Sequence, residues 1–206
     1  MKGQGVRDPA LVGAVATGDD PPGPRVCVFC GAKNGRSPRF TELARRTGDA
    51  FAKRRWTLVY GGGSVGMMGA LAEGTLAAGG AAIGVIPDVL MRREVGHTGL
   101  TRLEIVADMA SRKTRMIELS DAFLALPGGL GTLDELFEVL TLRQLKQHDK
   151  PIVLLSDDGY WDALVAACAN GVRNGLIAAG DLAVMDVVPT LDAAIERLAA
   201  VLARPA

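Results

Sequence analysis

The chain has 206 residues, of which 49% are hydrophobic, and its 23 basic side chains balance its 23 acidic ones. This length and composition are typical of a single globular domain, and the neutral balance lacks the excess positive charge by which proteins hold nucleic acids or anionic membranes. No apolar run approaches the roughly 20 residues that span a bilayer and the N-terminal stretch has no continuous signal-peptide core, so we expect a soluble, cytoplasmic protein.

Residues 1–23 combine Gly, Asp and Pro without sustained periodicity, which predicts a flexible N-terminal tail before one domain at residues 24–206. The domain opens with RVCVFC, residues 25–30, which alternates as a strand. Its Cys27 and Cys30 form a CxxC pair, but side chains three apart on a strand point to opposite faces and cannot share a metal ion. We therefore interpret both cysteines as small core residues of a protein from a reducing compartment.

Short β-rich runs then alternate with helical patterns. Strands are predicted at residues 57–60, 81–87, 103–107, 122–127 and 151–156, and helices at residues 41–55, 66–79, 109–120, 132–146, 161–172 and 191–202. This alternation predicts a parallel sheet covered on both faces, because parallel neighbours need a crossover connection. The expected fold class is α/β, with a single doubly wound, Rossmann-like sheet that binds ligands at the carboxyl ends of its strands.

The first glycine cluster, YGGGSVGMMG at residues 60–69, lies between a predicted strand and a predicted helix. Its leading residues Gly61, Gly62, Gly63 and Ser64 are candidates for supporting a phosphate, because glycine lets an anion approach the backbone. The cluster also satisfies G-x-G-x-x-G, and Asp88 follows about twenty residues later, where a dinucleotide site has its ribose-binding acid. That alternative is weakened because the fingerprint normally lies on the first strand of the fold.

The second cluster, LPGGLGTLDE at residues 126–135, also lies between a strand and a helix. The unpaired N–H groups of the helix that follows supply donors and a partial positive charge. Two such loops at one edge of a sheet predict a phosphorylated ligand. Neither loop is followed by Lys-Ser or Lys-Thr, which argues against a Walker-type ATP site.

Two acids, Asp134 and Glu135, are expected in the first turn of that helix, where their charges would oppose a phosphate. Three interpretations remain open. Thr132-x-x-Glu135 can be a capping box; Glu135 can face the sugar, orient a water molecule and stabilise an oxocarbenium-like transition state; or the carboxylates can bind magnesium. The basic pair Arg112 and Lys113 is expected at the same edge, where an arginine can donate hydrogen bonds to a departing purine.

Residues 127–135 match in full the motif P-G-G-x-G-T-x-x-E, and the chain resembles the Lonely Guy (LOG) phosphoribohydrolases in this motif. The similarity runs from CVFCG through VYGGGSVGMMG, AAGGAAIGVIP, EVGHTGLT, MASRK and HDKPIVLL to DGYW. It implies hydrolysis of the N-glycosidic bond of a cytokinin riboside 5′-monophosphate, or of AMP, to the free base and ribose 5-phosphate. It implies no metal and no cofactor, and nothing suggests a pyridoxal site although such proteins are often labelled lysine decarboxylases. A non-catalytic carrier of a nucleotide or of molybdenum cofactor is the alternative.

The resemblance also implies roles for individual residues, with Arg112 and Glu135 as the catalytic pair. The substrate-binding residues that it implies are Glu94, Arg112, Lys113, Gly129, Leu130, Gly131, Thr132, Leu133, Asp134, Glu135 and Thr141, while Gly128 joins the residues that support the phosphate. The expected partner is then a nucleoside 5′-monophosphate, and no nucleic acid or membrane is expected. Because members of the family pair their subunits, the resemblance also implies a homodimer.

The chain departs from the family pattern at three places. Ala110 replaces the histidine of M-H-x-R-K, Ala32 and Lys33 replace the serines of C-G-S-S, and Leu142 stands where a tryptophan is frequent. Because the catalytic pair is intact, we expect these changes to affect the substrate preference more than the reaction.

Overall fold

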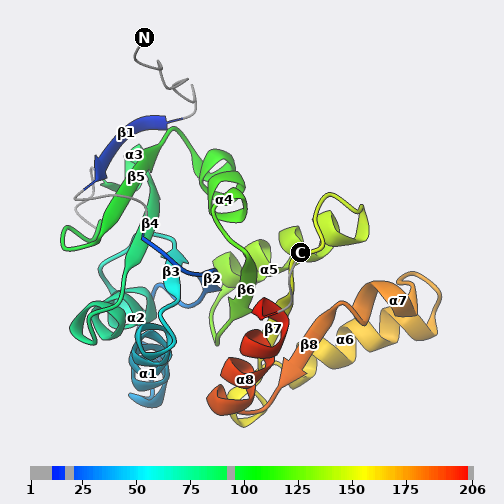
Figure 1. The fold of residues 1–206 in the computed structure, drawn as a ribbon. Helices are drawn as coiled ribbons and strands as arrows, with labels where there is room; N and C mark the ends of the chain where they lie inside the picture. The colour runs from blue at the N-terminus through cyan, green and yellow to red at the C-terminus, as the bar shows by residue number, and fades with distance from the viewer. Residues whose placement is uncertain (1–10, 17–20, 92–95, 204–206) are drawn as a thin grey trace.

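The computed structural model describes residues 11–16, 21–91 and 96–203, and their strands form one twisted sheet with helices on both faces (Figure 1). The strands are β1 (Leu11–Ala16), β2 (Arg25–Phe29), β3 (Thr57–Tyr60), β4 (Ala82–Pro87), β5 (Arg102–Val106), β6 (Ala122–Ala125), β7 (Ile152–Leu155) and β8 (Met185–Val188). The helices are α1 (Arg39–Lys53), α2 (Gly66–Ala77), α3 (Asp88–Met91), α4 (Met109–Glu118), α5 (Leu130–Gln144), the 3₁₀ turn η1 (Asp157–Gly159), α6 (Asp162–Arg173), α7 (Ala179–Leu182) and α8 (Leu191–Leu202).

The strand order is β1-β5-β4-β3-β2-β6-β7-β8, and the pairs from β5 to β8 are all parallel. The predicted doubly wound α/β class is therefore confirmed. The central strands β3, β4, β6 and β7 are buried along their whole length, as expected for strands covered on both faces. Since β2 lies between β3 and β6, the chain reverses its direction of winding across the sheet at this strand, and loops at its carboxyl end diverge around a crevice.

Two hydrophobic clusters fill the space on the two faces of the sheet. Residues of α1, α2 and α8 contribute to one cluster, and residues of α4, α5 and α6 pack in the other. Cys30 belongs to the first cluster and Cys27 to the second, which confirms that the two thiols face opposite sides of the strand. The three cysteines are free and buried.

Two edge strands differ from the sequence-based expectations. Residues 11–16, predicted to lie in a flexible tail, form β1 and pair antiparallel with β5, so that part of the prediction is wrong. The segment Met185–Val188, which was not predicted as a strand, pairs with β7 as β8. Both are at the edges of the sheet, where half of the backbone pairing and much of the burial that produce a strong strand pattern are missing. Among the described residues, no helix combines the length and the apolar character needed to cross a bilayer.

Candidate active site

Three loops meet at the carboxyl edge of the sheet: β2–α1, β3–α2 and β6–α5. Backbone hydrogen bonds join them at Gly31, whose N–H donates to the carbonyl oxygen of Pro127 (3.2 Å) and whose carbonyl accepts from the N–H of Met67 (3.1 Å). The β2–α1 loop therefore lies between the two glycine clusters. This junction lies at the crevice where a sheet of this class binds its ligands.

The β3–α2 loop, which carries the first glycine cluster, is closed inward. Gly61, Gly62 and Gly63 are buried, and the Tyr60 hydroxyl donates to the Gly63 carbonyl oxygen (3.3 Å). A Cβ atom on Gly61 would lie 1.7 Å from Nη2 of Arg112. The glycine at this position thus makes room for a guanidinium group from α4, a role that the phosphate interpretation of the loop does not include.

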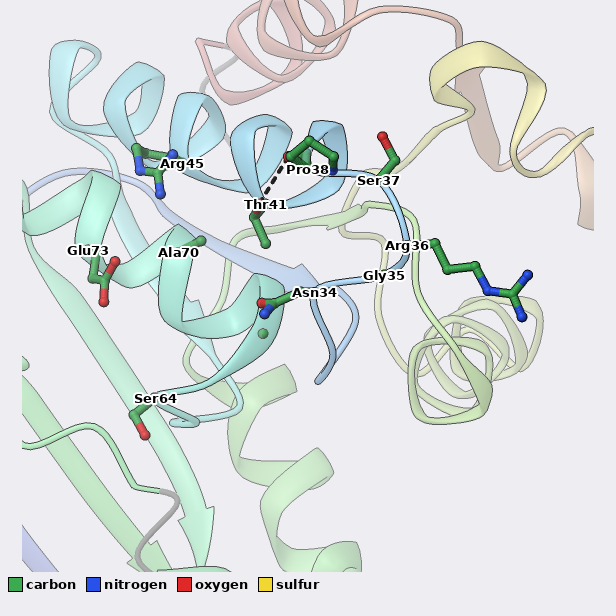
Figure 2. A pocket seen from close by; sticks show the side chains of 11 residues that line it. Asn34, Gly35, Arg36, Ser37, Pro38, Thr41, Arg45, Ser64, Ala70 and Glu73 are labelled. Atoms are coloured by element: carbon green, nitrogen blue, oxygen red, sulfur yellow. Dashed lines mark hydrogen bonds between the residues drawn. The ribbon is translucent and has the colours of Figure 1, made fainter.

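A cavity of about 460 Å³ lies between this loop, the β2–α1 loop and helices α1 and α2, and Figure 2 shows the side chains that line it. Its lining is polar for the most part and consists of Asn34, Gly35, Arg36, Ser37, Pro38, Thr41, Arg45, Ser64, Gly66, Ala70 and Glu73. The Arg36 side chain points away from Ser64 and Glu73 (Figure 2). The cavity shares Ser64 with the first glycine loop but includes neither Arg112 nor Glu135, so we assign the chemistry to the neighbouring buried pair and not to this larger space.

The β6–α5 loop, which carries the second glycine cluster, is open. Helix α5 begins at Leu130 with Gly129 as its N-cap, and no side chain caps it. Gly129, Leu130 and Gly131 are exposed. The first backbone N–H groups of a helix have no partner within the helix, so this terminus presents donors and the positive end of the helix dipole to an anion.

The start of α5 also overturns the capping-box interpretation. Thr132 is the third residue of the helix and not its N-cap, and both predicted first-turn acids lie in the second turn. The Thr132 side chain is buried, and its Oγ1 has no hydrogen-bond partner among the described residues. A buried hydroxyl without a partner costs free energy, and an oxygen atom of a ligand at the loop would satisfy it.

Arg112 and Glu135 form a buried ion pair next to these loops. Nη1 of Arg112 lies 3.1 Å from Oε1 of Glu135, and the two side chains are only 9% and 8% exposed. Nε of Arg112 also donates to the carbonyl oxygen of Val85 (3.2 Å), which lies near the carboxyl end of β4. The predicted pair is thus brought together from two helices on one face of the sheet, with the guanidinium fixed by its neighbours.

Burial raises the pKa of Glu135 to about 7, because a carboxylate loses hydration inside the protein. The Arg112 guanidinium opposes this rise, and the nearby Asp134 carboxylate adds to it. The ion-pair distance alone would suggest a low pKa, but the loss of hydration outweighs a single contact. Glu135 therefore exchanges protons near neutral pH, as an acid/base group does.

Lys113 is held by two carboxylates on α5. Its Nζ lies 3.0 Å from Oδ2 of Asp134 and 2.6 Å from Oε2 of Glu138, and the hydrogen bond to Glu138 is the main cause of its raised pKa. The acids expected to repel a phosphate thus bind basic side chains: Asp134 binds Lys113 and Glu135 binds Arg112. Each of the two acids proposed as magnesium ligands therefore has a cationic partner of its own.

A second cavity of about 320 Å³ lies between α4 and α5, lined by Lys113, Asp134, Phe137, Glu138, Thr141 and Leu142. Thr141, predicted to bind substrate, therefore lines the same cavity as Lys113 and Asp134. Leu133, also predicted to bind substrate, is half-buried near the start of α5 and does not line this cavity. Glu94 lies outside the described residues. Gly96, close to it in sequence, forms a bridge with Gly63, so the chain returns to the first glycine loop there.

The sequence patterns assigned no role to two groups that the structure places at the site. One is the β2–α1 loop, whose residues 34–37 line the larger cavity. The other is Tyr160, whose hydroxyl donates to the carbonyl oxygen of Gly128 (2.7 Å). The motif DGYW contains this tyrosine, and its position directly after a predicted strand at the same sheet edge was the only indication available.

Comparison with known proteins adds independent findings. A family described as "Possible lysine decarboxylase" matches residues 68–198. A probable cytokinin riboside 5′-monophosphate phosphoribohydrolase of Oryza sativa subsp. japonica is 45% identical over 166 residues, which cover 81% of this chain and 74% of that protein. A cytokinin riboside 5′-monophosphate phosphoribohydrolase of Rhodococcoides fascians is 48% identical over 153 residues, which cover 74% of this chain and 77% of that protein.

Solved structures share the fold at lower identity. The molybdenum cofactor carrier protein of Chlamydomonas reinhardtii has a TM-score of 0.68 and 23% identity, with 88% of this chain and 99% of that chain covered. The molybdenum cofactor binding protein of Rippkaea orientalis has a TM-score of 0.66 and 22% identity, with 87% and 97% covered. At such identities the likeness concerns the fold alone.

Proposed function

This chain belongs to the family of cytokinin riboside 5′-monophosphate phosphoribohydrolases, and we propose that it hydrolyses the N-glycosidic bond of these nucleotides, or of AMP, with Arg112 and Glu135 as its catalytic residues. The products are the free base and ribose 5-phosphate. The observation that carries the assignment of residues is the buried Arg112–Glu135 pair between a closed glycine loop and an open one.

The phosphate of the substrate binds at the start of α5. Its donors are the backbone N–H groups of Gly129, Leu130 and Gly131, together with the hydroxyl of Thr132, which has no other partner in the described part of the chain. Backbone donors and a helix dipole bind an anion without a cluster of basic side chains. This agrees with a formal net charge of zero for the whole chain.

Glu135 lies one helical turn further along α5. We infer that the ribose binds between the phosphate site and this carboxylate. In the reaction the oxygen of a water molecule bonds to the anomeric carbon, the carbon–nitrogen bond breaks, and its electron pair leaves with the base. The Glu135 carboxylate stabilises the positive charge on the sugar and accepts the proton of the water. A pKa of about 7 suits a group that must take up and release this proton near neutral pH.

Arg112 assists the departing base. Its Nη1 and Nε atoms are used by Glu135 and Val85, while Nη2 lies against Gly61. A guanidinium fixed in this way donates hydrogen bonds to the ring nitrogens of the base and balances the negative charge that develops there.

The phosphate site is tested by comparing AMP, isopentenyladenosine monophosphate, ATP and adenosine as substrates, with the release of free base followed by chromatography. Because binding energy from the phosphate is used to orient the sugar, we expect adenosine to be far poorer than AMP, by a factor of roughly a hundred or more in kcat/KM. ATP should also be a poor substrate, because the backbone donors at the start of α5 suit one phosphate group and offer no partners to two more. Equal turnover of AMP and adenosine would show that the loops serve another purpose.

The same assay separates an enzyme from a carrier of a nucleotide or of molybdenum cofactor. A carrier would bind AMP, or the cofactor, without releasing adenine. The resemblance to the cofactor-binding structures does not favour that alternative, since it extends to the fold alone.

We also propose that the protein is a homodimer that pairs through α4 and α5. Each helix has exposed apolar side chains: Met109 on α4 is 45% exposed, Phe137 on α5 is 42% exposed, and Leu145, the C-cap of α5, is 60% exposed. A second subunit would cover them. Phe137→Glu should shift the mass in light scattering from dimer to monomer, whereas Leu176→Glu, at an 86% exposed position after α6, should leave it unchanged. A monomeric wild-type protein with full activity at micromolar concentration would contradict the proposal.

The expected cytoplasmic location is likewise a proposal. It is supported by three cysteines that are all free and buried, as in proteins of a reducing compartment. Fractionation of the native cells with antibody detection would test it.

A further inference from the structure

The chain has two tyrosines, and each donates its hydroxyl to a glycine carbonyl in one of the two glycine loops. Tyr60 directly precedes its loop, is fully buried, and bonds Gly63 at 3.3 Å. Tyr160 comes from a different part of the chain, between β7 and α6, and bonds Gly128 at 2.7 Å. The second contact is the shorter one, and it joins the open loop to a third segment of the sheet edge.

The turn that carries Tyr160 is itself firmly held. The Oγ atom of Ser156 accepts from the N–H of Trp161 (3.0 Å) and donates to Oδ1 of Asp162 (2.9 Å). The ring of Tyr160 meets the rings of Phe40 and Trp161 edge to face, with centroids 5.7 and 4.7 Å apart. An ion pair between Arg39 and Asp158 ties the same turn to the start of α1. The position of the hydroxyl is therefore set before any ligand arrives.

The hydrogen bond from Tyr160 acts on one particular peptide group. In a trans peptide the C=O and the following N–H point in opposite directions, so holding the Gly128 carbonyl also fixes the direction of the Gly129 N–H. The preceding peptide is held in the same way, because the Pro127 carbonyl accepts from the Gly31 N–H (3.2 Å). On its other side, Gly128 packs so tightly that a Cβ atom would lie 2.0 Å from Oγ1 of Thr132.

We propose that Tyr160 is a positioning residue for the phosphate of the substrate: its hydroxyl holds the Gly128–Gly129 peptide so that the Gly129 N–H, together with the first N–H groups of α5, faces the anion. Its bond to the carbonyl also polarises the peptide and strengthens the N–H as a donor. This inference rests on the proposed function, because it deepens the description of that phosphate site. In this proposal Tyr160 acts through the loop and not directly on the sugar or the base.

The test compares the wild-type protein with Tyr160→Phe, which removes the hydroxyl and keeps the ring between Phe40 and Trp161. Binding of ribose 5-phosphate is measured by calorimetry, with ribose as a blank, and kcat and KM are measured with AMP. We expect the Kd of ribose 5-phosphate and the KM of AMP to rise together by roughly three- to tenfold, the effect of one hydrogen bond. We expect kcat to change by less than about twofold, since the catalytic pair is untouched.

Ser120→Ala is the matched control. The Ser120 hydroxyl donates to the carbonyl oxygen of Met116 over the same 2.7 Å, but it lies before β6, at the opposite edge of the sheet. It should lower the melting temperature and leave the Kd of ribose 5-phosphate unchanged. An unchanged Kd in Tyr160→Phe would overturn the proposal, and so would an equal rise in Ser120→Ala. If wild-type protein binds ribose 5-phosphate but does not hydrolyse AMP, the proposed reaction fails while the role of Tyr160 is still decided by the Kd.

Discussion

The two glycine loops look alike in sequence, but one is buried in the structure and the other is exposed. Each lies between a parallel strand and a helix, and each cluster carries at least three glycines. In the loop after β3, Gly61 to Gly63 are buried and the space beside Gly61 is filled by the guanidinium of Arg112. In the loop after β6, Gly129 and Gly131 are exposed, and a Cβ atom on either would meet none of the described residues beyond its chain neighbours and its own helix within 4 Å.

The difference shows that a glycine-rich loop at a sheet edge has two physical uses. Absence of a side chain can admit a ligand to the backbone, or it can admit another side chain of the same protein. The closed loop makes room for the arginine that we propose to be catalytic, whereas the open loop exposes the backbone at which we propose that the phosphate binds. Substitutions in one loop, or in the ion pair between the two loops, therefore show whether the other loop keeps its function.

The largest effect is expected from the ion pair. Glu135→Gln keeps the size of the side chain but loses its charge, and it should lower kcat by roughly a hundredfold or more, the scale of a positioned acid/base or electrostatic group. The Kd of ribose 5-phosphate should stay the same or fall, because the open loop is intact. Arg112→Ala should also abolish turnover, because the departing base loses its hydrogen-bond donor.

Glu138→Gln is the matched control for this change, because Glu138 is on the same helix and binds Lys113 instead of Arg112. It should keep kcat within about threefold. A normally active Glu135→Gln protein would sink the mechanism proposed here and make a nucleotide carrier the better explanation of the site.

A second test concerns stability and pH. The pKa of Glu135 is raised from 4.5 to about 7 in the folded protein, so between these values the folded state binds the proton more tightly than the unfolded state. Stability then falls as the pH rises through this window, by an amount on the order of 2 kcal/mol once relaxation of the buried site is allowed for. The Glu135→Gln protein lacks this pH-dependent change in stability, because glutamine does not titrate.

Urea unfolding of both proteins at several values from about pH 5 to about pH 8 measures this contribution to the free energy of unfolding. The variant should gain stability relative to wild type as the pH rises. A constant difference across the range would mean that Glu135 is charged throughout and that its burial matters little.

Gly61→Ala tests the closed loop. The added methyl group would lie 1.7 Å from Nη2 of Arg112, so the guanidinium must move. We expect kcat to fall by roughly tenfold or more, because small displacements of a catalytic group are costly. The Kd of ribose 5-phosphate should be unchanged. An equal loss of ribose 5-phosphate affinity would indicate that both loops hold the phosphate.

Much of this site could be predicted from the sequence. The alternation of strands and helices put both glycine clusters and Arg112 at one edge of the sheet, and the motif ending in Glu135 named the second member of the pair. These predictions succeeded because strand, loop and helix are local patterns, and parallel strands all end at the same edge.

The remainder depended on contacts between distant segments. Gly128 and Tyr160 are 32 residues apart, and no periodicity links them. The helix start was also misplaced: Thr132 and Glu135 fit the spacing of a capping box, but α5 begins two residues earlier, at Leu130, and the hydroxyl of Thr132 is buried instead. The edge strand β1 was missed because a short, small-residue segment such as LVGAVA gains its structure by pairing with β5.

The smallest effect, and the most direct test of the comparison, is expected from Gly131→Ala in the open loop. Gly131 lies in the first turn of α5, where alanine is favoured over glycine by roughly 0.5–1 kcal/mol. Apart from its neighbours in the chain and the backbone of its own helix, no atom of the described residues would lie within 4 Å of its Cβ. The protein should therefore become slightly more stable. If a phosphate approaches this turn, the methyl group stands near its path, and the Kd of ribose 5-phosphate should rise by roughly two- to fivefold with kcat unchanged. Gly180→Ala, an equally open position in α7, should leave that Kd as it is. A more stable Gly131→Ala protein with unaltered affinity would place the glycines of the open loop in the same class as Gly61, as residues that serve the chain itself, and the contrast between the two loops would no longer hold.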